Sequence, residues 1–195
     1  MSPRSKAQNE AIRSKSIFLI KETALELFAH KGYHSTSISQ IAKEAGVSKG
    51  LLYNYFSGKE ELLEVLLLEA AEEIEVEITE IMETIADPFE QLKQLTGQSF
   101  LMIKNNLHHW RLVTSLAFQT DVLKDLESVL NAKKEVLIGQ MVDLFRRLGM
   151  EDPVNEALYF AALVDGIILH YMMVGKDYPL EKMEALILTR YQNIK

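Results

Sequence analysis

Apolar residues recur at three- and four-residue steps along most of the chain, which is the spacing of one buried face of an α-helix. Asp87-Pro88 and Asp152-Pro153 mark helix starts, because each places a capping carboxylate before a proline at the first helical position. Glycines follow several periodic stretches and mark helix ends. The predicted helices cover residues 13–31, 37–45, 48–56, 59–86, 88–104, 108–119, 122–148, 153–174 and 180–194.

The sequence contains no convincing strand pattern and no repeat of fixed period. We therefore predict an all-α protein with three helices in an N-terminal domain and about six in a C-terminal domain. Residues 1–12 are polar and are predicted to form a flexible tail, in which Arg4 and Lys6 are possible groove or phosphate contacts. The two domains are predicted at residues 13–70 and 71–195.

Within the first domain, residues 37–56 predict two short helices joined by a tight turn. Ser37 can cap the first helix, and Gly46 can end it in a left-handed conformation at little steric cost. Ser48 can cap the second helix, whose buried side carries Leu52 and, four residues later, another large apolar side chain. The opposite side presents small, amide and phenolic groups, which suit the major groove of DNA. We interpret this segment as a helix-turn-helix.

The residues around this segment extend the match. In order along the chain they are Ala24, Leu27-Phe28, Gly32-Tyr33, Thr36-Ser37-Ile38, Ile41-Ala42, Ala45-Gly46-Val47-Ser48-Lys49-Gly50, Leu52-Tyr53, Tyr55-Phe56, Lys59-Glu60 and Leu62. This order resembles the TetR family of bacterial transcriptional regulators over roughly residues 13–70. Residues 71–195 resemble the family only in length, helicity and position.

The net charge of −7 is unevenly divided along the chain. Residues 1–60 hold nine Lys and Arg against five Asp and Glu, whereas residues 61–195 hold twelve against twenty-three. The basic part contains the helix-turn-helix, as binding to phosphates requires. The acidic remainder repels DNA and favours binding at one end of the molecule.

Candidate DNA contacts follow from side-chain chemistry and from the family resemblance. The resemblance implies that Tyr53, Tyr55 and Lys59 bind phosphates. Ser37 and Ser39 can add contacts near the start of the first helix of the motif. Candidates for contact with base edges occupy the second helix, where Lys suits guanine, Asn suits adenine and Leu can pack on a thymine methyl group; they are Lys49, Gly50, Leu51 and Asn54.

A single head contacts few base pairs, so we expect a homodimer on a palindromic operator in double-stranded DNA. The last two predicted helices carry apolar stripes that can form a four-helix interface, the arrangement that the resemblance also implies. Packing within one chain would produce the same stripes. The candidate interface residues are Leu158, Ala161, Ala162, Asp165, Leu169, Met183, Leu186, Ile187 and Tyr191.

The C-terminal domain is rich in apolar, aromatic and Met residues, which line small-molecule sites but also fill ordinary cores. The resemblance implies that an unknown, largely apolar effector binds there and releases the protein from its operator. A domain that binds a protein partner or only dimerises is the alternative, and activation in place of repression also stays open. The candidate pocket residues are Met102, Trp110, Phe118, Met141, Phe145, Tyr159 and Tyr171.

Other function classes find little support in the sequence. The five histidines lack metal-ligand spacing: His108 and His109 are adjacent, and His170 lies five residues after Asp165. The acid–base pairs that could be proposed, Asp165 with His170 or Glu156 with Tyr159, have no supporting context, so no enzyme, metal or cofactor is predicted. The chain has no cysteine, no apolar run near 18 residues and no secretory signal at its start. We expect a bacterial cytoplasmic protein with no membrane partner, associated with the nucleoid when bound to DNA.

Overall fold

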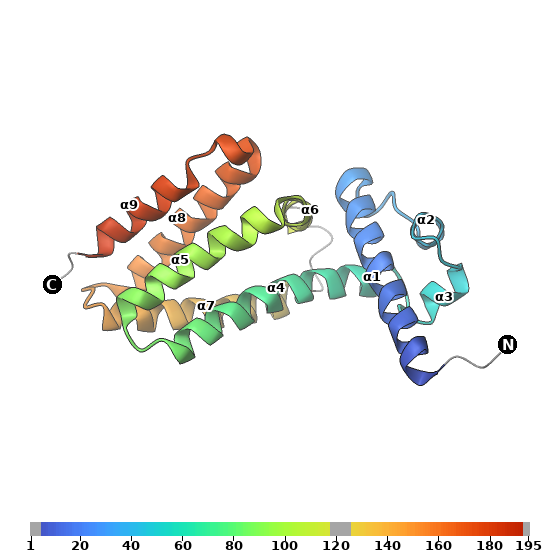
Figure 1. Ribbon diagram of the computed structural model, residues 1–195, viewed down its shortest axis with the longest axis horizontal. Helices are drawn as coiled ribbons and strands as arrows, with labels where there is room; N and C mark the ends of the chain where they lie inside the picture. The colour runs from blue at the N-terminus through green and yellow to red at the C-terminus, as the bar shows by residue number, and fades with distance from the viewer. Residues whose placement is uncertain (1–4, 118–125, 193–195) are drawn as a thin grey trace. The chain divides into compact units, whose positions relative to one another are not determined.

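The computed structural model describes residues 5–117 and 126–192, and every regular element in these ranges is a helix (Figure 1). The chain forms two compact units. The N-terminal unit comprises Met1–Ala70 with Leu112–Leu126, and the C-terminal unit comprises Ala71–Arg111 with Glu127–Lys195. The prediction of an all-α fold is confirmed.

The N-terminal unit contains α1 (Lys6–Lys31), α2 (Ile38–Glu44), α3 (Lys49–Tyr53) and the first part of α4 (Lys59–Thr84). Its core combines fully buried side chains from all four helices. Burial of these apolar groups outweighs the low intrinsic stability of helices as short as α2 and α3. The fully buried residues include Ile20, Ala24, Phe28, Ile41, Leu52 and Leu62.

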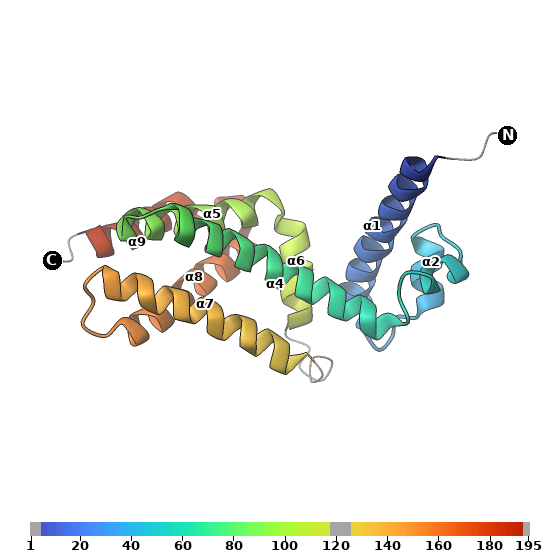
Figure 2. The same ribbon diagram turned by 90° about the horizontal axis from the view of Figure 1, so that it is seen from below.

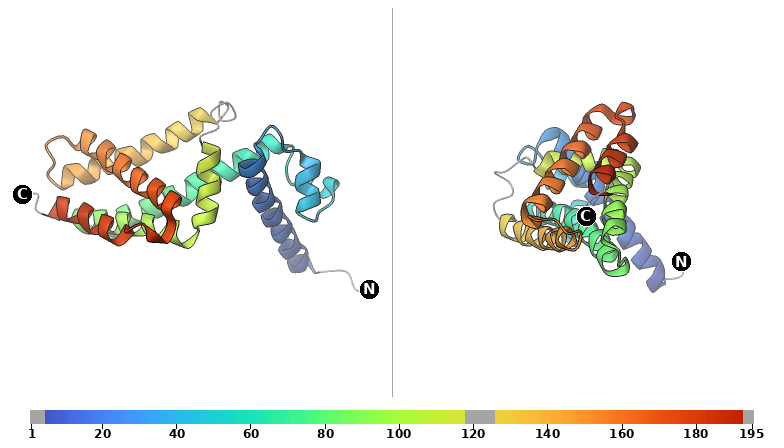
Figure 3. Two further views of the ribbon diagram at one scale, coloured as in Figure 1. Left: turned by 90° about the horizontal axis from the view of Figure 1, so that it is seen from above. Right: turned by 90° about the vertical axis from the view of Figure 1, so that its left-hand side faces the viewer.

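The C-terminal unit contains the rest of α4 with α5 (Pro88–Asn105), part of α6 (Leu107–Ala117), α7 (Glu127–Arg147), α8 (Pro153–Val174), η1 (Gly175–Asp177) and α9 (Leu180–Gln192). The helix α5 packs against α7, α8 and α9. Figure 2 shows α7 beside α8, and Figure 3 shows α8 and α9 as an antiparallel pair joined through η1. Three aromatic rings, those of Phe145, Phe160 and Tyr191, meet in this core with centroids 5.3 to 6.2 Å apart.

Both Asp-Pro start signals operate as predicted. Asp87 accepts a hydrogen bond from the Glu90 backbone N–H at 2.7 Å, and Asp152 accepts one from the Asn155 backbone N–H at 3.2 Å. The proline that follows each aspartate occupies the first turn, where its missing N–H costs no helical hydrogen bond.

The end of α4 has no local stop signal: no glycine follows it, and its last turn contains no basic residue. The amide of Gln91, on α5, caps it instead. Its Nε2 donates to the carbonyl oxygens of Met82 at 2.9 Å and Ile85 at 2.6 Å. Its Oε1 accepts from Arg147 Nη2 at 2.6 Å, and the residue is 1% exposed. A buried amide from another helix therefore satisfies the carbonyl groups that helix ends leave unpaired.

Two predictions need correction. Residues 6–12 are not part of a flexible tail but belong to α1, which starts at a capping box formed by Ser5 and Gln8. Residues 1–4 lie outside the described ranges. The segment Pro153–Asp177 is also long and apolar enough to cross a membrane by length and composition, since an 18-residue window within it reaches a mean hydropathy of 1.7. In the structure this helix packs against other helices of the bundle.

Replacing Gln91 by Met should remove the cap of α4 while keeping the volume of the side chain. We expect the free energy of unfolding to fall by about 2–4 kcal/mol, because two carbonyl groups and an arginine lose a buried partner. Urea denaturation followed by circular dichroism measures the change. Gln94→Met, on the same helix but bonded to the half-buried Glu90, is the matched control and should cost under about 0.5 kcal/mol. Equal effects would show that the Gln91 contacts are not special.

Candidate DNA-binding surface

The helices α2 and α3 form the predicted helix-turn-helix. Ser37 accepts a hydrogen bond from the Gln40 backbone N–H at 3.3 Å, and Ser48 accepts one from the Leu51 backbone N–H at 3.1 Å. The turn begins at Gly46, whose φ of 69° lies in the left-handed region. Hydrogen bonds from Val47 to the Ala42 carbonyl and from Gly46 to the Lys43 carbonyl close a Schellman motif. Local sequence signals therefore fix the turn.

The structure divides the candidate contacts into two groups. Leu52 points into the core, so the opposite side of α3 is turned outward. The exposed group is Ser37, Ser39, Lys49, Gly50, Tyr53 and Asn54; the half-buried group is Leu51, Tyr55 and Lys59. The helix itself is shorter than predicted, since it ends at Tyr53 and Asn54 forms its C-cap.

Nothing in the protein's own structure requires a glycine at position 50. Its φ lies outside the left-handed region, and a Cβ built on it would meet no protein atom within 4 Å. Glycine inside a helix is normally less stable than alanine. Packing within the chain therefore does not explain this residue, and close approach to DNA stays as the prediction.

Lys59 has internal partners that the sequence did not reveal. Its Nζ donates to the carbonyl oxygens of Tyr33 at 3.2 Å, Thr36 at 3.4 Å and His34 at 3.5 Å. The same nitrogen lies 4.4 Å from the centroid of the Tyr33 ring. Burial, assisted by the carboxylate of Glu60, raises the pKa of the Tyr33 hydroxyl to about 12, so the ring stays neutral over the physiological range. The ammonium of Lys59 thus joins the start of α4 to the segment between α1 and α2.

Two further cations of this unit lie over tyrosine rings. Lys49 Nζ is 5.8 Å from the centroid of Tyr53, and the guanidinium carbon of Arg13 is 5.8 Å from the centroid of Tyr55. Arg13 is not among the contacts that the sequence predicts, because no local pattern connects residues so far apart in the chain.

The candidate pocket residues do not share one environment. Trp110, Met141, Phe145 and Tyr171 are buried, whereas Met102 is half-buried and Phe118 lies outside the described residues. The indole N–H of Trp110 has no hydrogen-bond partner among the described residues. Of the seven candidates, Tyr159 is the one that lines either of the two described depressions.

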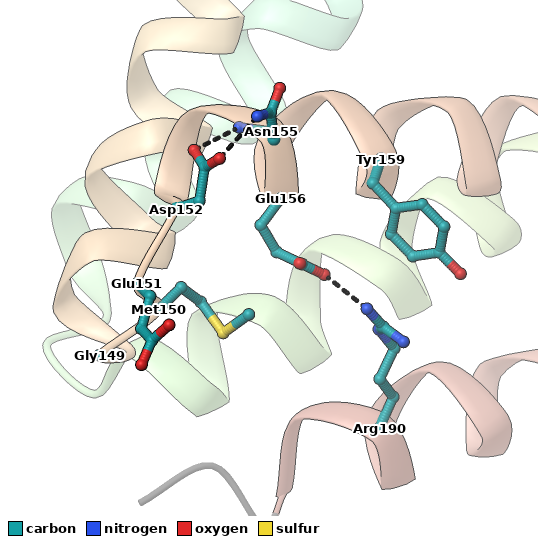
Figure 4. A pocket seen from close by; sticks show the side chains of 8 residues that line it. All are labelled: Gly149, Met150, Glu151, Asp152, Asn155, Glu156, Tyr159 and Arg190. Carbon is teal, nitrogen blue, oxygen red and sulfur yellow. Dashed lines mark hydrogen bonds and ion pairs between the residues drawn. The ribbon is translucent and has the colours of Figure 1, made fainter.

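Figure 4 shows the depression beside Tyr159, with a volume of about 550 Å³. Five of its eight lining residues are charged or carry an amide: Glu151, Asp152, Asn155, Glu156 and Arg190. Glu156 accepts hydrogen bonds from Tyr191 Oη at 2.5 Å and from Arg190 Nη2 at 3.2 Å, and the Arg190 guanidinium lies 4.7 Å from the Tyr159 centroid. The Glu156 carboxylate is therefore held by hydrogen bonds within the chain. A second depression, of about 490 Å³, is lined by four glutamates and by Lys133, which is paired with Glu75.

The candidate dimer residues also differ in how exposed they are. Leu158, Ala162, Asp165, Leu169 and Leu186 are exposed, and Ala161 and Met183 are half-buried. Ile187 and Tyr191 are buried within the chain, so their assignment to an exposed interface is wrong. The physical reason is that α9 is amphipathic and turns this side toward the core, where the Tyr191 ring contacts Phe145 and Phe160.

Two histidines of the C-terminal unit make aromatic contacts. His109 packs edge-on against Trp110, and the ring of His170 stacks on Tyr178 with centroids 5.9 Å apart. Across the described ranges, no group of three His, Cys, Asp or Glu side chains is arranged to hold a metal ion.

Lys59→Met should lower the free energy of unfolding by about 1–3 kcal/mol, because three carbonyl groups lose a charged donor. Thermal and urea unfolding of the variant measure the loss. Lys43→Met removes the same charge from an exposed position on α2 and serves as the control. Unchanged stability of the Lys59 variant would contradict the internal role and leave the ammonium available to DNA.

Comparison with known proteins places these features in a family. Residues 20–66 match the model of the bacterial regulatory proteins of the tetR family. The chain is 27% identical over 188 residues to the HTH-type transcriptional regulator BetI of Escherichia coli K12, covering 93% of this chain and 92% of BetI. It is 32% identical over 187 residues to the uncharacterized HTH-type transcriptional regulator YuxN of Bacillus subtilis, covering 90% of this chain and 62% of YuxN.

A solved structure shows the same fold. The regulator AibR, in complex with isovaleryl coenzyme A and operator DNA, aligns with a TM-score of 0.70 and 20% identity over 90% of this chain and 97% of AibR. The relatives are regulators, so the chain is a regulator and not an enzyme. Together, the helix-turn-helix geometry and these likenesses show that the chain belongs to the TetR family of bacterial transcriptional regulators.

Proposed function

We propose that the protein is a dimeric, sequence-specific repressor that a small-molecule effector releases from a palindromic operator. The observation that carries the DNA-binding part is the exposed side of α3. Lys49, Gly50, Tyr53 and Asn54 are all exposed there, while Leu52 anchors the helix in the core. A short helix fixed in this way can enter a major groove with its polar side chains toward the base edges.

The surface of α8 supports the dimer. Exposed side chains occur at positions 154, 158, 162, 165, 169 and 173, which follow one side of the helix. Leu158 is 49% exposed, Leu169 41% and Met173 73%; on the adjacent α9, Leu186 is 62% exposed. A contiguous apolar surface of this kind marks a protein interface. We propose that a second copy of the chain covers it.

Asp165 is the charged member of this side of α8. Crowding by neighbouring atoms raises the pKa of its carboxyl above the ordinary value although the side chain still touches solvent, and Lys134 acts in the opposite direction. Burial in a dimer would be costly for an unpaired carboxylate, so Lys134 is its candidate partner there.

The effector site is proposed within the C-terminal unit, around the buried indole of Trp110. An unpaired buried N–H is energetically unfavourable, and a ligand carbonyl or carboxylate would relieve the cost. The other buried candidates of this unit, Met141, Phe145 and Tyr171, are apolar or aromatic, which fits a largely apolar ligand that carries one acceptor. AibR supports a ligand-responsive function by its complex with an acyl coenzyme A. An effector that binds the conformation without DNA more tightly would release the operator.

Repression is the default that we propose, since a protein on its operator blocks a promoter until the effector removes it. We infer a cytoplasmic location, on the nucleoid while the operator is bound. The first experiment selects bound duplexes from a random library with the purified protein. A palindrome with half-sites about one helical turn apart supports the proposal, and the absence of a shared sequence contradicts it.

Leu169→Glu should disrupt the dimer, because it would bury a carboxylate without a partner. Analytical ultracentrifugation should show a monomer, with binding to the full palindrome reduced to the level of a half-site. Val136→Glu introduces the same charge at an exposed position on α7 and should leave the dimer intact. A dimeric Leu169→Glu variant would place the interface elsewhere.

Gly50→Ala should separate stability from DNA binding. The variant should be as stable as the wild type or more stable by up to about 1 kcal/mol, because alanine is the better helix former and the added Cβ meets no protein atom. Its affinity for the selected operator should fall at least roughly tenfold if backbone and DNA approach closely. Fluorescence anisotropy measures the affinity. Unaltered affinity would exclude close approach at this position.

A further inference from the structure

The first three turns of α1 lie upstream of residues 20–66, the part of the chain that matches the family model. They are nevertheless ordered as helix. Ser5 Oγ accepts from the Gln8 backbone N–H at 3.2 Å, and Gln8 Oε1 accepts from the Ser5 backbone N–H at 2.9 Å. This capping box satisfies two donors at the start of the helix. The cations of this segment are therefore carried on a helix and not on a tail.

The cations of the N-terminal unit differ in how they are engaged. Lys21 pairs with Glu69 at 2.5 Å, and Lys31 pairs with Glu44 at 3.2 Å. Lys59 donates to three carbonyl oxygens. Arg13 instead has an aromatic neighbour, Tyr55, and no ion pair within the described part of the chain.

The contact between Arg13 and Tyr55 joins α1 to the residues that follow α3. The guanidinium carbon lies 5.8 Å from the ring centroid, within the range of a cation–π interaction. A cation–π contact uses none of the N–H donors of the guanidinium in hydrogen bonds, so these donors stay available. Five donors in a fixed plane are well suited to the oxygens of a phosphate.

We propose that Arg13 binds a backbone phosphate of the operator and that Tyr55 positions it, so that the DNA-binding surface extends from the helix-turn-helix onto α1. The inference rests on the proposed function, since it adds a contact to the same DNA. It follows from three observations together: an ordered helix start, a guanidinium without a carboxylate partner, and its place beside a tyrosine of the recognition segment.

The test measures operator affinity by fluorescence anisotropy between about 50 and about 300 mM salt, for full-length wild type and Arg13→Ala. The duplex is the one recovered by selection. We expect the affinity to fall roughly tenfold and the salt slope to become shallower by about 0.9 for each head. The loss should be equal on the operator and on a duplex with altered half-sites, because phosphate contacts carry no sequence information.

Lys15→Ala is the matched control, since it removes one exposed cation two residues away on the same helix. It should leave the salt slope unchanged. Arg13→Lys keeps the charge without the planar group and should restore the slope but only part of the affinity. In a Tyr55→Leu background, Arg13→Ala should have a smaller effect than in the wild type, because the two residues act together.

A wild-type salt slope in Arg13→Ala, with circular dichroism showing an intact fold, would overturn the inference. Equal slope changes in Arg13→Ala and Lys15→Ala would overturn it too, since they would indicate a general charge effect. Asn54→Ala distinguishes this failure from failure of the proposed function. If Asn54→Ala weakens binding while Arg13→Ala does not, the inference about Arg13 fails and the regulator remains.

Discussion

The helix α4 is held at both ends by side-chain nitrogens that donate to backbone carbonyl oxygens. At its start, Lys59 reaches three carbonyl groups of the segment between α1 and α2. At its end, Gln91 reaches the last carbonyl groups of α4 and is itself held by Arg147. The helix α4 contributes residues to both units. The Lys59 contacts constrain its start within the N-terminal unit, and the Gln91 contacts constrain its end within the C-terminal unit. Glu80 and Glu83 lie at the end of α4 where the helix dipole disfavours negative charge, and the Gln91 contacts at this end oppose that effect.

The N-terminal unit separates cations that stabilise the fold from cations that stay available. Lys21, Lys31 and Lys59 bind partners of the same unit, and each of these contacts connects different helices or turns. Arg13 and Lys49 lie over tyrosines instead. A cation over an aromatic ring keeps most of its charge and its hydrogen-bonding edge, so it can still bind a phosphate. Net charge alone would not distinguish these two groups.

The C-terminal unit shows how one helix serves two surfaces. On α8, Phe160, Ile167 and Tyr171 are buried, while Leu158 and Leu169 are exposed on the other side. An exposed apolar side of this kind marks a surface that a second copy, another protein or a membrane can cover. The mean hydropathy of α8 is compatible with each of these environments. The buried side packs within the bundle of its own chain, and the proposed function assigns the exposed side to a second copy.

The sequence by itself determined the helices, the Asp-Pro starts and the tight turn at Gly46, because each depends on residues within a few positions of one another. It also determined the family, because many residue types fall at fixed offsets along residues 13–70. It also predicted an outward side of the second helix of the motif, on which Lys49, Gly50, Tyr53 and Asn54 are exposed and Leu51 is half-buried. Only the tertiary structure decided the partners of Lys59, the Gln91 cap and the place of Arg13 beside Tyr55. It also decided that Ile187 and Tyr191 face the core and that residues 6–12 are helical. Contacts between distant segments have no local signature, and an amphipathic stripe does not say whether its own chain or another one covers it.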